Sequence, residues 1–135
     1  MGGERVIFLV EDDPDTEALV LRALRRAEAD PVVVARDGAE ALALIAAMPD
    51  APRLVLLDLK IPKIDGFTVL QRIRERFEAS AIVVFSSDES PDAVRHATEL
   101  GATRYAVKPT DYDALDATIR ELVHQYGVPG VDARV

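Results

Sequence analysis

The chain has 135 residues, of which 49% are hydrophobic and 30% are charged, and its formal net charge is −8 at pH 7. This length fits one domain with its own core, and the negative charge argues against non-specific nucleic-acid binding, which needs clustered positive charge. The absence of cysteine excludes disulfides, thiolate metal sites and a cysteine nucleophile. No apolar run approaches the ~18 residues that span a bilayer, and the N-terminus lacks a signal-peptide pattern. We therefore expect a soluble, cytoplasmic protein that binds neither membrane nor nucleic acid.

The first half of the chain alternates short apolar runs with amphipathic stretches. Residues 6–10 form a continuous apolar run, too short for a helix and typical of a strand that is buried on both faces. Asp13 followed by Pro14 predicts an N-cap with proline at the first helical position. The elements expected in this half are a strand at 6–10, a helix from 14 to about 28, a strand at 32–35 and a helix from about 39 to 48.

The second half repeats the pattern. An apolar run at 54–57 ends abruptly at Asp58, and Ser90 before Pro91 predicts another helix start. Gly101 lies where a helix C-terminus commonly has glycine. The elements expected here are strands at 54–57, 81–85 and 103–107, and helices that carry Leu70 to Phe77, Val94 to Leu100 and Tyr112 to Tyr126.

Five strand–helix units in series predict an α/β fold. Strands this apolar, separated by helices, indicate a parallel sheet that is covered on both faces. Right-handed crossovers then give a doubly wound, three-layer domain. We assign residues 1–127 to this domain and 128–135 to a short tail, which leaves no room for an output domain.

Polar side chains follow the predicted strands at the edge where such sheets bind ligands, beyond the carboxyl ends of the strands. They are Glu11, Asp12 and Asp13 after the first strand, Asp58 after the third, Ser86 and Ser87 after the fourth, and Lys108 after the fifth. Two carboxylates about 4 Å apart repel by roughly 4 kcal/mol at an effective dielectric near 20. Three in one pocket need a cation, and Mg²⁺ suits because it binds carboxylates and phosphate oxygens together.

The same edge carries groups that suit phosphate. Lys108 supplies a compact positive charge, and Ser86 can donate a hydrogen bond to a phosphoryl oxygen. A carboxylate at the centre of such a site can itself attack phosphorus and form an acyl phosphate. Phosphoryl transfer then depends mainly on positioning and on neutralising the phosphoryl oxygens.

These residues resemble the receiver domains of response regulators in two-component signalling. The matching segments are Leu9-Val10-Glu11-Asp12, Leu56-Leu57-Asp58-Leu59-Lys60-Ile61-Pro62, Asp65-Gly66, Phe85-Ser86-Ser87 and Tyr105-Ala106-Val107-Lys108-Pro109. The resemblance covers about residues 5–126, and all five segments occur in order at the expected strand ends. It implies a flavodoxin-like sheet with strand order 2-1-3-4-5.

The resemblance also implies a role for each site residue. Asp58 is then the phosphoacceptor, with Asp12 as a direct Mg²⁺ ligand and Glu11 acting through water. The backbone carbonyl of Lys60 completes the protein ligands. The phosphoryl group is then held by Ser86, Lys108 and the backbone N–H of Ser87, and the conformational switch consists of Ser86 and Tyr105, which act on the face formed by the fourth helix, fifth strand and fifth helix.

One assignment has an alternative, because the acidic pair can be either Glu11 with Asp12 or Asp12 with Asp13. We favour Glu11 and Asp12, since they directly follow the apolar run and Asp13 is better used as the N-cap before Pro14.

The partner implied by the resemblance is a sensor histidine kinase. The whole chain is also similar to the small, often dimeric regulators that serve phytochrome-type kinases, and the stripe of apolar residues on the last helix offers a possible homodimer seam. We expect a signalling protein rather than an enzyme, with slow loss of its own phosphoryl group.

Three other functions remain to be weighed. An aspartyl-nucleophile phosphatase needs a second acid two residues after the nucleophile, where this chain has Lys60. A nucleotide or flavin binder needs a Gly- or Ser/Thr-rich phosphate loop after the first strand, where this chain has acids. The third alternative is a degenerate receiver that only docks to partners. This chain has a suitable residue at every chemical position, which argues against that alternative. A measurement of Mg²⁺ affinity would distinguish a degenerate receiver from an active one.

Overall fold

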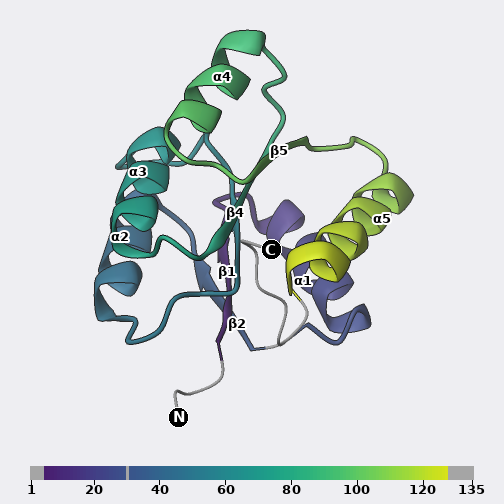
Figure 1. Ribbon diagram of the computed structural model, residues 1–135. Coiled ribbons are helices and arrows are strands. Elements are labelled where there is room, and N and C mark those ends of the chain that lie inside the picture. The colour runs from purple at the N-terminus through teal and green to yellow at the C-terminus, as the bar shows by residue number, and fades with distance from the viewer. Residues whose placement is uncertain (1–4, 30, 128–135) are drawn as a thin grey trace.

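The computed structural model describes residues 5–29 and 31–127, and strands and helices alternate along them (Figure 1). The strands are β1 (Ile7–Val10), β2 (Val32–Ala35), β3 (Leu54–Leu57), β4 (Ala81–Ser86) and β5 (Arg104–Val107). The helices are α1 (Pro14–Arg26), α2 (Gly38–Ala47), α3 (Gly66–Arg76), α4 (Pro91–Glu99) and α5 (Tyr112–Leu122), and a π-helical turn, η1 (Val123–Gly127), follows α5. The α/β class is confirmed, whereas the predicted tail at 128–135 lies outside the described residues.

The five strands form one parallel sheet in the order β2-β1-β3-β4-β5, as expected. β1 and β3 are neighbours, and the register pairs Val10 with Leu57 at their carboxyl ends. The next residues along each strand, Glu11 and Asp58, therefore leave the sheet side by side. The amide of Asp58 continues the pairing by donating to the carbonyl of Val10 at 3.0 Å.

Two helical layers cover the sheet, with α1 and α5 on one face and α2, α3 and α4 on the other (Figure 1). Alternate residues of a strand point to opposite faces, so Ile7 and Leu9 pack toward α1 and α5, while Phe8 and Val10 pack toward the other layer. All four are buried. The burial of both faces explains why the strands are continuous apolar runs rather than alternating ones.

Each helix begins at a side chain that caps it. The caps of α1, α2, α3, α4 and α5 are Asp13, Asp37, Asp65, Ser90 and Asp111, and each accepts a hydrogen bond from a backbone N–H in the first turn. These caps satisfy N–H groups that have no partner inside a helix. They fix where each helix starts, and hence the path of each loop at the carboxyl edge of the sheet.

A few predicted boundaries are wrong. α1 ends at Arg26 rather than near residue 28, because Glu28 takes a left-handed conformation with φ 55°. β5 starts at Arg104, one residue later than predicted. The Ile82 amide donates to the side-chain hydroxyl of Thr103 at 2.9 Å, so a side-chain contact takes the place of the strand pairing there. The last helix extends through Tyr126 as predicted, but its final turn, from Val123, is the π-helical η1.

Candidate functional site

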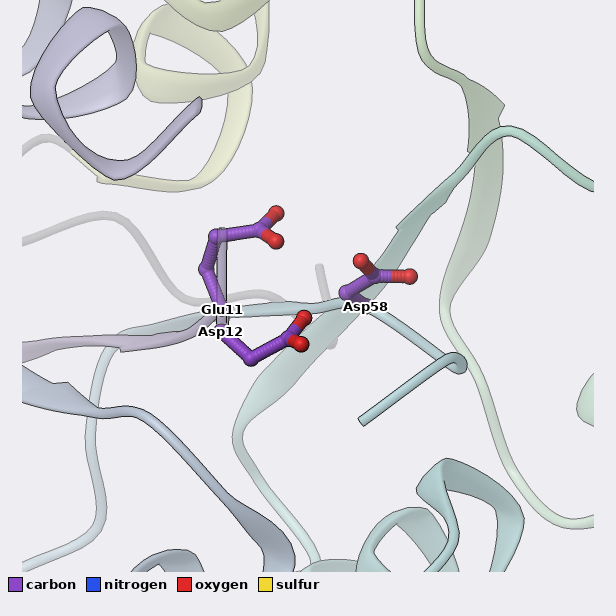
Figure 2. Close-up of side chains that lie close together, drawn as sticks. All are labelled: Glu11, Asp12 and Asp58. Atoms are coloured by element: carbon purple, nitrogen blue, oxygen red, sulfur yellow. The ribbon is translucent and has the colours of Figure 1, made fainter. Parts of the chain in front are cut away.

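Three carboxylates gather at the carboxyl ends of β1 and β3 (Figure 2). One carboxylate oxygen from each of Glu11, Asp12 and Asp58 lies within 4.8 Å of the others. Glu11 is 1% exposed and Asp58 is 6% exposed, whereas Asp12 faces solvent. The cluster thus combines two buried charges with one open side from which a solvated ion or substrate can enter.

Lys108 bridges the two buried carboxylates. Its Nζ lies 2.7 Å from Glu11 Oε1 and 2.8 Å from Asp58 Oδ2. Burial alone would lower the pKa of Lys108, but its hydrogen bonds to Asp58 and Glu11 outweigh that effect and raise it. The ammonium therefore remains charged and offsets part of the negative charge of the cluster.

Burial also acts on Glu11. It raises the pKa of this carboxyl to about 7, with the charge of Asp58 acting in the same direction and the hydrogen bond to Lys108 opposing it. A single ammonium therefore does not fully compensate these acids. Hard carboxylate oxygens with excess negative charge match the ligands that Mg²⁺ takes, so the donor set fits a divalent cation.

Asp13 has a different local role. Its Oδ2 accepts from the amide of Thr16 at 3.0 Å and from the hydroxyl of Thr16 at 2.6 Å. The hydrogen bonds from Thr16 lower the pKa of Asp13. Its backbone N–H donates to Glu11 Oε2 at 3.2 Å, so the residue both caps α1 and orients Glu11.

The hydroxyl groups at the end of β4 lie on the side of Asp58 away from β1, because β3 lies between β1 and β4. Ser86 is fully buried, and its Oγ accepts from the backbone N–H of Asp88 at 3.2 Å. The Tyr105 hydroxyl donates to the main-chain carbonyl of the same Asp88. Ser86 and Tyr105 are thus joined through one peptide segment, while Ser87 is exposed beside it.

Lys60 contributes through its backbone. Its side chain is exposed, and its N–H donates to Asp58 Oδ1 at 3.1 Å, which orients that carboxylate. The structure thus places the site residues that the sequence suggested at one edge of the sheet, except for Tyr105, which lies within β5 and reaches that edge with its hydroxyl. The sequence did not indicate the main-chain carbonyl of Asp88, because a backbone acceptor leaves no signal in residue type.

Residues 7–120 match the model of the response regulator receiver domain family. The chain belongs to this family. The match covers every strand and most of α5, including all the site residues above. Receiver domains bind a divalent metal at an acidic cluster of this kind.

Curated relatives of this receiver domain include longer proteins. It is 35% identical over 124 residues to the probable methanogenesis regulatory protein FilR2 of Methanothrix harundinacea, covering 87% of this chain and 80% of that protein. It is 31% identical to the transcriptional regulatory protein ZraR of Klebsiella oxytoca, covering 90% of this chain but only 27% of that protein. The chain therefore spans a minor part of some relatives.

Solved structures similar to this receiver domain include phytochrome response regulators. It is 29% identical to the phosphorylated cyanobacterial phytochrome response regulator RcpA, covering 96% of this chain and 99% of that one, with a TM-score of 0.84. For the Mn²⁺-bound response regulator Rcp1 the identity is 28%, the coverage 95% and 97%, and the TM-score 0.83. The bacteriophytochrome response regulator RtBRR is 34% identical, with 96% of this chain and 84% of that chain covered and a TM-score of 0.74.

Among residues 5–29 and 31–127, no helix of the receiver domain combines the length and apolar character needed to cross a membrane.

Proposed function

We propose that this receiver domain accepts a phosphoryl group on Asp58 from a sensor histidine kinase in a Mg²⁺-dependent reaction. The observation that carries the proposal is the position of Asp58, whose carboxylate lies close to those of Glu11 and Asp12 and in contact with the ammonium of Lys108. A carboxylate oxygen of Asp58 attacks phosphorus, the N–P bond of a phosphohistidine breaks, and the imidazole leaves. The product is an acyl phosphate on the domain.

The proposed metal ligands are Asp12, Asp58 and the backbone carbonyl of Lys60, with Glu11 acting through water. When bound, Mg²⁺ would neutralise negative charge on the carboxylates and on the incoming phosphoryl oxygens. The burial of Glu11 beside Asp58 supports its place in the acidic pair. The carboxylate of Asp13 is already engaged in the α1 cap, which argues against Asp13 as a ligand.

The proposed phosphoryl ligands are Ser86, Lys108 and the backbone N–H of Ser87. The ammonium of Lys108 already contacts Asp58 Oδ2, so a small movement would exchange this contact for one with a phosphoryl oxygen. A hydrogen bond to a charged group contributes roughly 1.5–3 kcal/mol. Positioning and charge neutralisation are what phosphoryl transfer requires of a protein.

The proposed switch runs from Ser86 to Tyr105. When the hydroxyl of Ser86 turns toward the phosphoryl group, its contact with the Asp88 amide changes, and Asp88 also holds the Tyr105 hydroxyl. The response would therefore reach the α4–β5–α5 face. To move a population from 1:99 to 99:1, phosphorylation must favour the active state by about 5.5 kcal/mol, which a few charge-assisted hydrogen bonds can largely supply.

The proposed partner is a kinase of the phytochrome type, which the likeness to RcpA, Rcp1 and RtBRR supports. We also propose that residues 1–127 act as one receiver domain, with 128–135 as a tail, in the cytoplasm. A homodimer through the α4–β5–α5 face is supported by exposed apolar residues there, since Val107 is 41% exposed and Tyr112 is 69% exposed.

The test is the intact mass of the protein after incubation with Mg²⁺ and a small acyl-phosphate donor. We expect one added phosphoryl group, which is lost in Asp58→Asn and without Mg²⁺ but kept in Asp13→Asn. A wild-type protein that neither gains the group nor binds Mg²⁺ would instead be a docking module. If Asp13→Asn fails to gain the phosphoryl group while Glu11→Gln still gains it, the acidic pair is Asp12 and Asp13.

A further inference from the structure

The loop between β3 and α3 contains a strained turn. The N–H of Ile64 donates to the carbonyl of Pro62 at 3.0 Å, and Lys63 between them has φ 74°. This is the geometry of a γ-turn with a positive central φ, which is rare and strained, and the central residue is not glycine. Such strain persists only where the surrounding structure enforces it, and it gathers at functional sites.

The start of α2 holds this turn in place. The N–H of Gly38 donates to the same Pro62 carbonyl at 3.0 Å. Lys63 Nζ lies 3.2 Å from Asp37 Oδ2, while Asp37 Oδ1 accepts from the amide of Glu40 at 2.7 Å. The turn is therefore attached to the start of α2 by one backbone hydrogen bond, from Gly38, and by one ion pair, to the capping residue Asp37.

Gly38 allows the loop to come this close. A Cβ atom on Gly38 would lie 2.1 Å from the carbonyl oxygen of Ile64 and 2.7 Å from its carbon. Both atoms are backbone, so no side-chain rotation relieves the clash. A residue larger than glycine at this position must push the loop away from α2.

The same short loop carries Lys60, whose N–H is tied to the Asp58 carboxylate at 3.1 Å. At its other end, the N–H of Gly66 donates to the carbonyl of Leu59 at 3.2 Å. The loop thus closes on itself beside Asp58, and its outer bend at Lys63 rests on α2. A displacement of that bend changes the direction of the peptide groups that follow Asp58.

We propose that Asp37, Gly38 and Lys63 are positioning residues that hold the main-chain carbonyl of Lys60 in place for the metal. The inference rests on the proposed function, since it assigns these residues to the Mg²⁺ site described there. They act through the loop and need no contact with the ion. Residues that hydrogen-bond a metal ligand typically change the affinity for the metal by 10- to 100-fold when they are lost. Asp37, Gly38 and Lys63 act one step further out, through the loop, so the expected effect lies at the lower end of that range.

The first test is a Mg²⁺ titration of the unphosphorylated full chain, in which binding is monitored through the NMR chemical shifts of the backbone amides. We expect Gly38→Ala to weaken Mg²⁺ binding about 10-fold. Gly127→Ala is the matched control, because Gly127 is also buried but a Cβ there would meet only side chains, the nearest at 3.3 Å. The control should bind Mg²⁺ as the wild type does, with urea unfolding of all three proteins measured alongside.

Lys63→Glu provides a second test that does not depend on how well Gly38→Ala folds. Placing negative charge near the carboxylates should strengthen Mg²⁺ binding if only long-range attraction matters. The positioning role predicts weaker binding instead, because Glu at position 63 repels Asp37 and releases the turn. Binding that is unchanged or tighter in Lys63→Glu, or unchanged in a folded Gly38→Ala, overturns the inference. Absence of Mg²⁺ binding in the wild type refutes the proposed function itself.

Discussion

The ammonium of Lys108 lies 2.7 Å from the carboxylate of Glu11, which joins the first and last loops at the carboxyl edge of the sheet. The same ammonium contacts Asp58 at 2.8 Å, and its side chain is only 14% exposed. Lys108 therefore stands where positive charge is needed when no metal is bound. The Mg²⁺ proposed for this site would balance charge on the same carboxylate cluster, so the removal of Lys108 should increase the effect of the metal.

Lys108→Met should destabilise the metal-free domain by about 1–3 kcal/mol, because it leaves two buried carboxylates without their cationic partner. Added Mg²⁺ should recover more stability in this variant than in the wild type. Urea unfolding with and without Mg²⁺ measures both effects. Arg95→Met, which removes an exposed ion pair with Asp92, is the control and should change little. Equal losses in the two variants would contradict the bridging role.

Mg²⁺ should stabilise the wild-type domain by binding linkage. At a free Mg²⁺ concentration about ten times the dissociation constant, the expected gain is about 1.4 kcal/mol. Asp12→Ala should lose most of this gain at the same concentration, because it removes a proposed direct ligand. Asp13→Asn should keep the gain, since asparagine still caps α1. Thermal unfolding at fixed Mg²⁺ distinguishes the two acidic pairs through Asp13, because Asp12 belongs to both. Loss of the gain in Asp13→Asn as well as in Asp12→Ala would favour the pair Asp12 and Asp13.

Ser86→Ala should still accept a phosphoryl group, because Asp58 and the carboxylate cluster are intact. The change of shape should be weak, since Ser86 Oγ is the group that accepts from the Asp88 amide and would turn toward the phosphoryl group. Amide hydrogen exchange before and after phosphorylation measures the response around Tyr105. If the exchange differences in Ser86→Ala equal those of the wild type, the switch does not run through this hydroxyl.

The sequence predicted the fold well because its signals are local. The apolar run that begins β1 and the Asp13–Pro14 cap each depend on neighbouring residues alone. The acid cluster was also predictable, since parallel strands bring their carboxyl ends to one edge of the sheet. The contact between Lys108 and Glu11 was not, because side-chain partners across loops depend on distances that residue order does not encode. Nor was the turn at Lys63, where lysine occupies a conformation that usually signals glycine.

Stability at acid pH should depend on the aspartate caps. Hydrogen bonds from the first turn of each helix lower the pKa values of Asp13, Asp37 and Asp65, with Thr16, the Glu40 amide and Thr68 as the leading donors. A carboxyl with a lowered folded-state pKa adds stability that is present above its unfolded pKa of about 3.9. That stability is lost as pH falls through the folded values.

The urea midpoint should therefore be flat near neutral pH for these groups and should fall below about pH 4. Asp65→Asn keeps a capping side chain without a titrating group, so its midpoint should fall less steeply over that range than the wild type. A slope identical to the wild type would mean that the Asp65 cap contributes no pH dependence.

Arg74 holds the end of α3 to two loops. Its guanidinium donates to the main-chain carbonyls of Gly101, Phe77, Glu78 and Ser80, at distances from 2.7 to 3.1 Å. Burial lowers the pKa of Arg74, so a half-buried cation is maintained here by carbonyl oxygens. Because the carbonyl of Gly101 belongs to the turn between α4 and β5, this residue anchors the end of α4 that lies away from Ser86.

Arg74→Met should cost about 2–4 kcal/mol in the free energy of unfolding, since four main-chain carbonyls, most of them part-buried, lose a donor at roughly 0.5–1.5 kcal/mol each. Arg74→Lys should recover only part of this, because an ammonium lacks the planar fork that reaches both loops at once. Urea unfolding ranks the three proteins. A loss below about 1 kcal/mol in Arg74→Met would show that water replaces the guanidinium at these carbonyls.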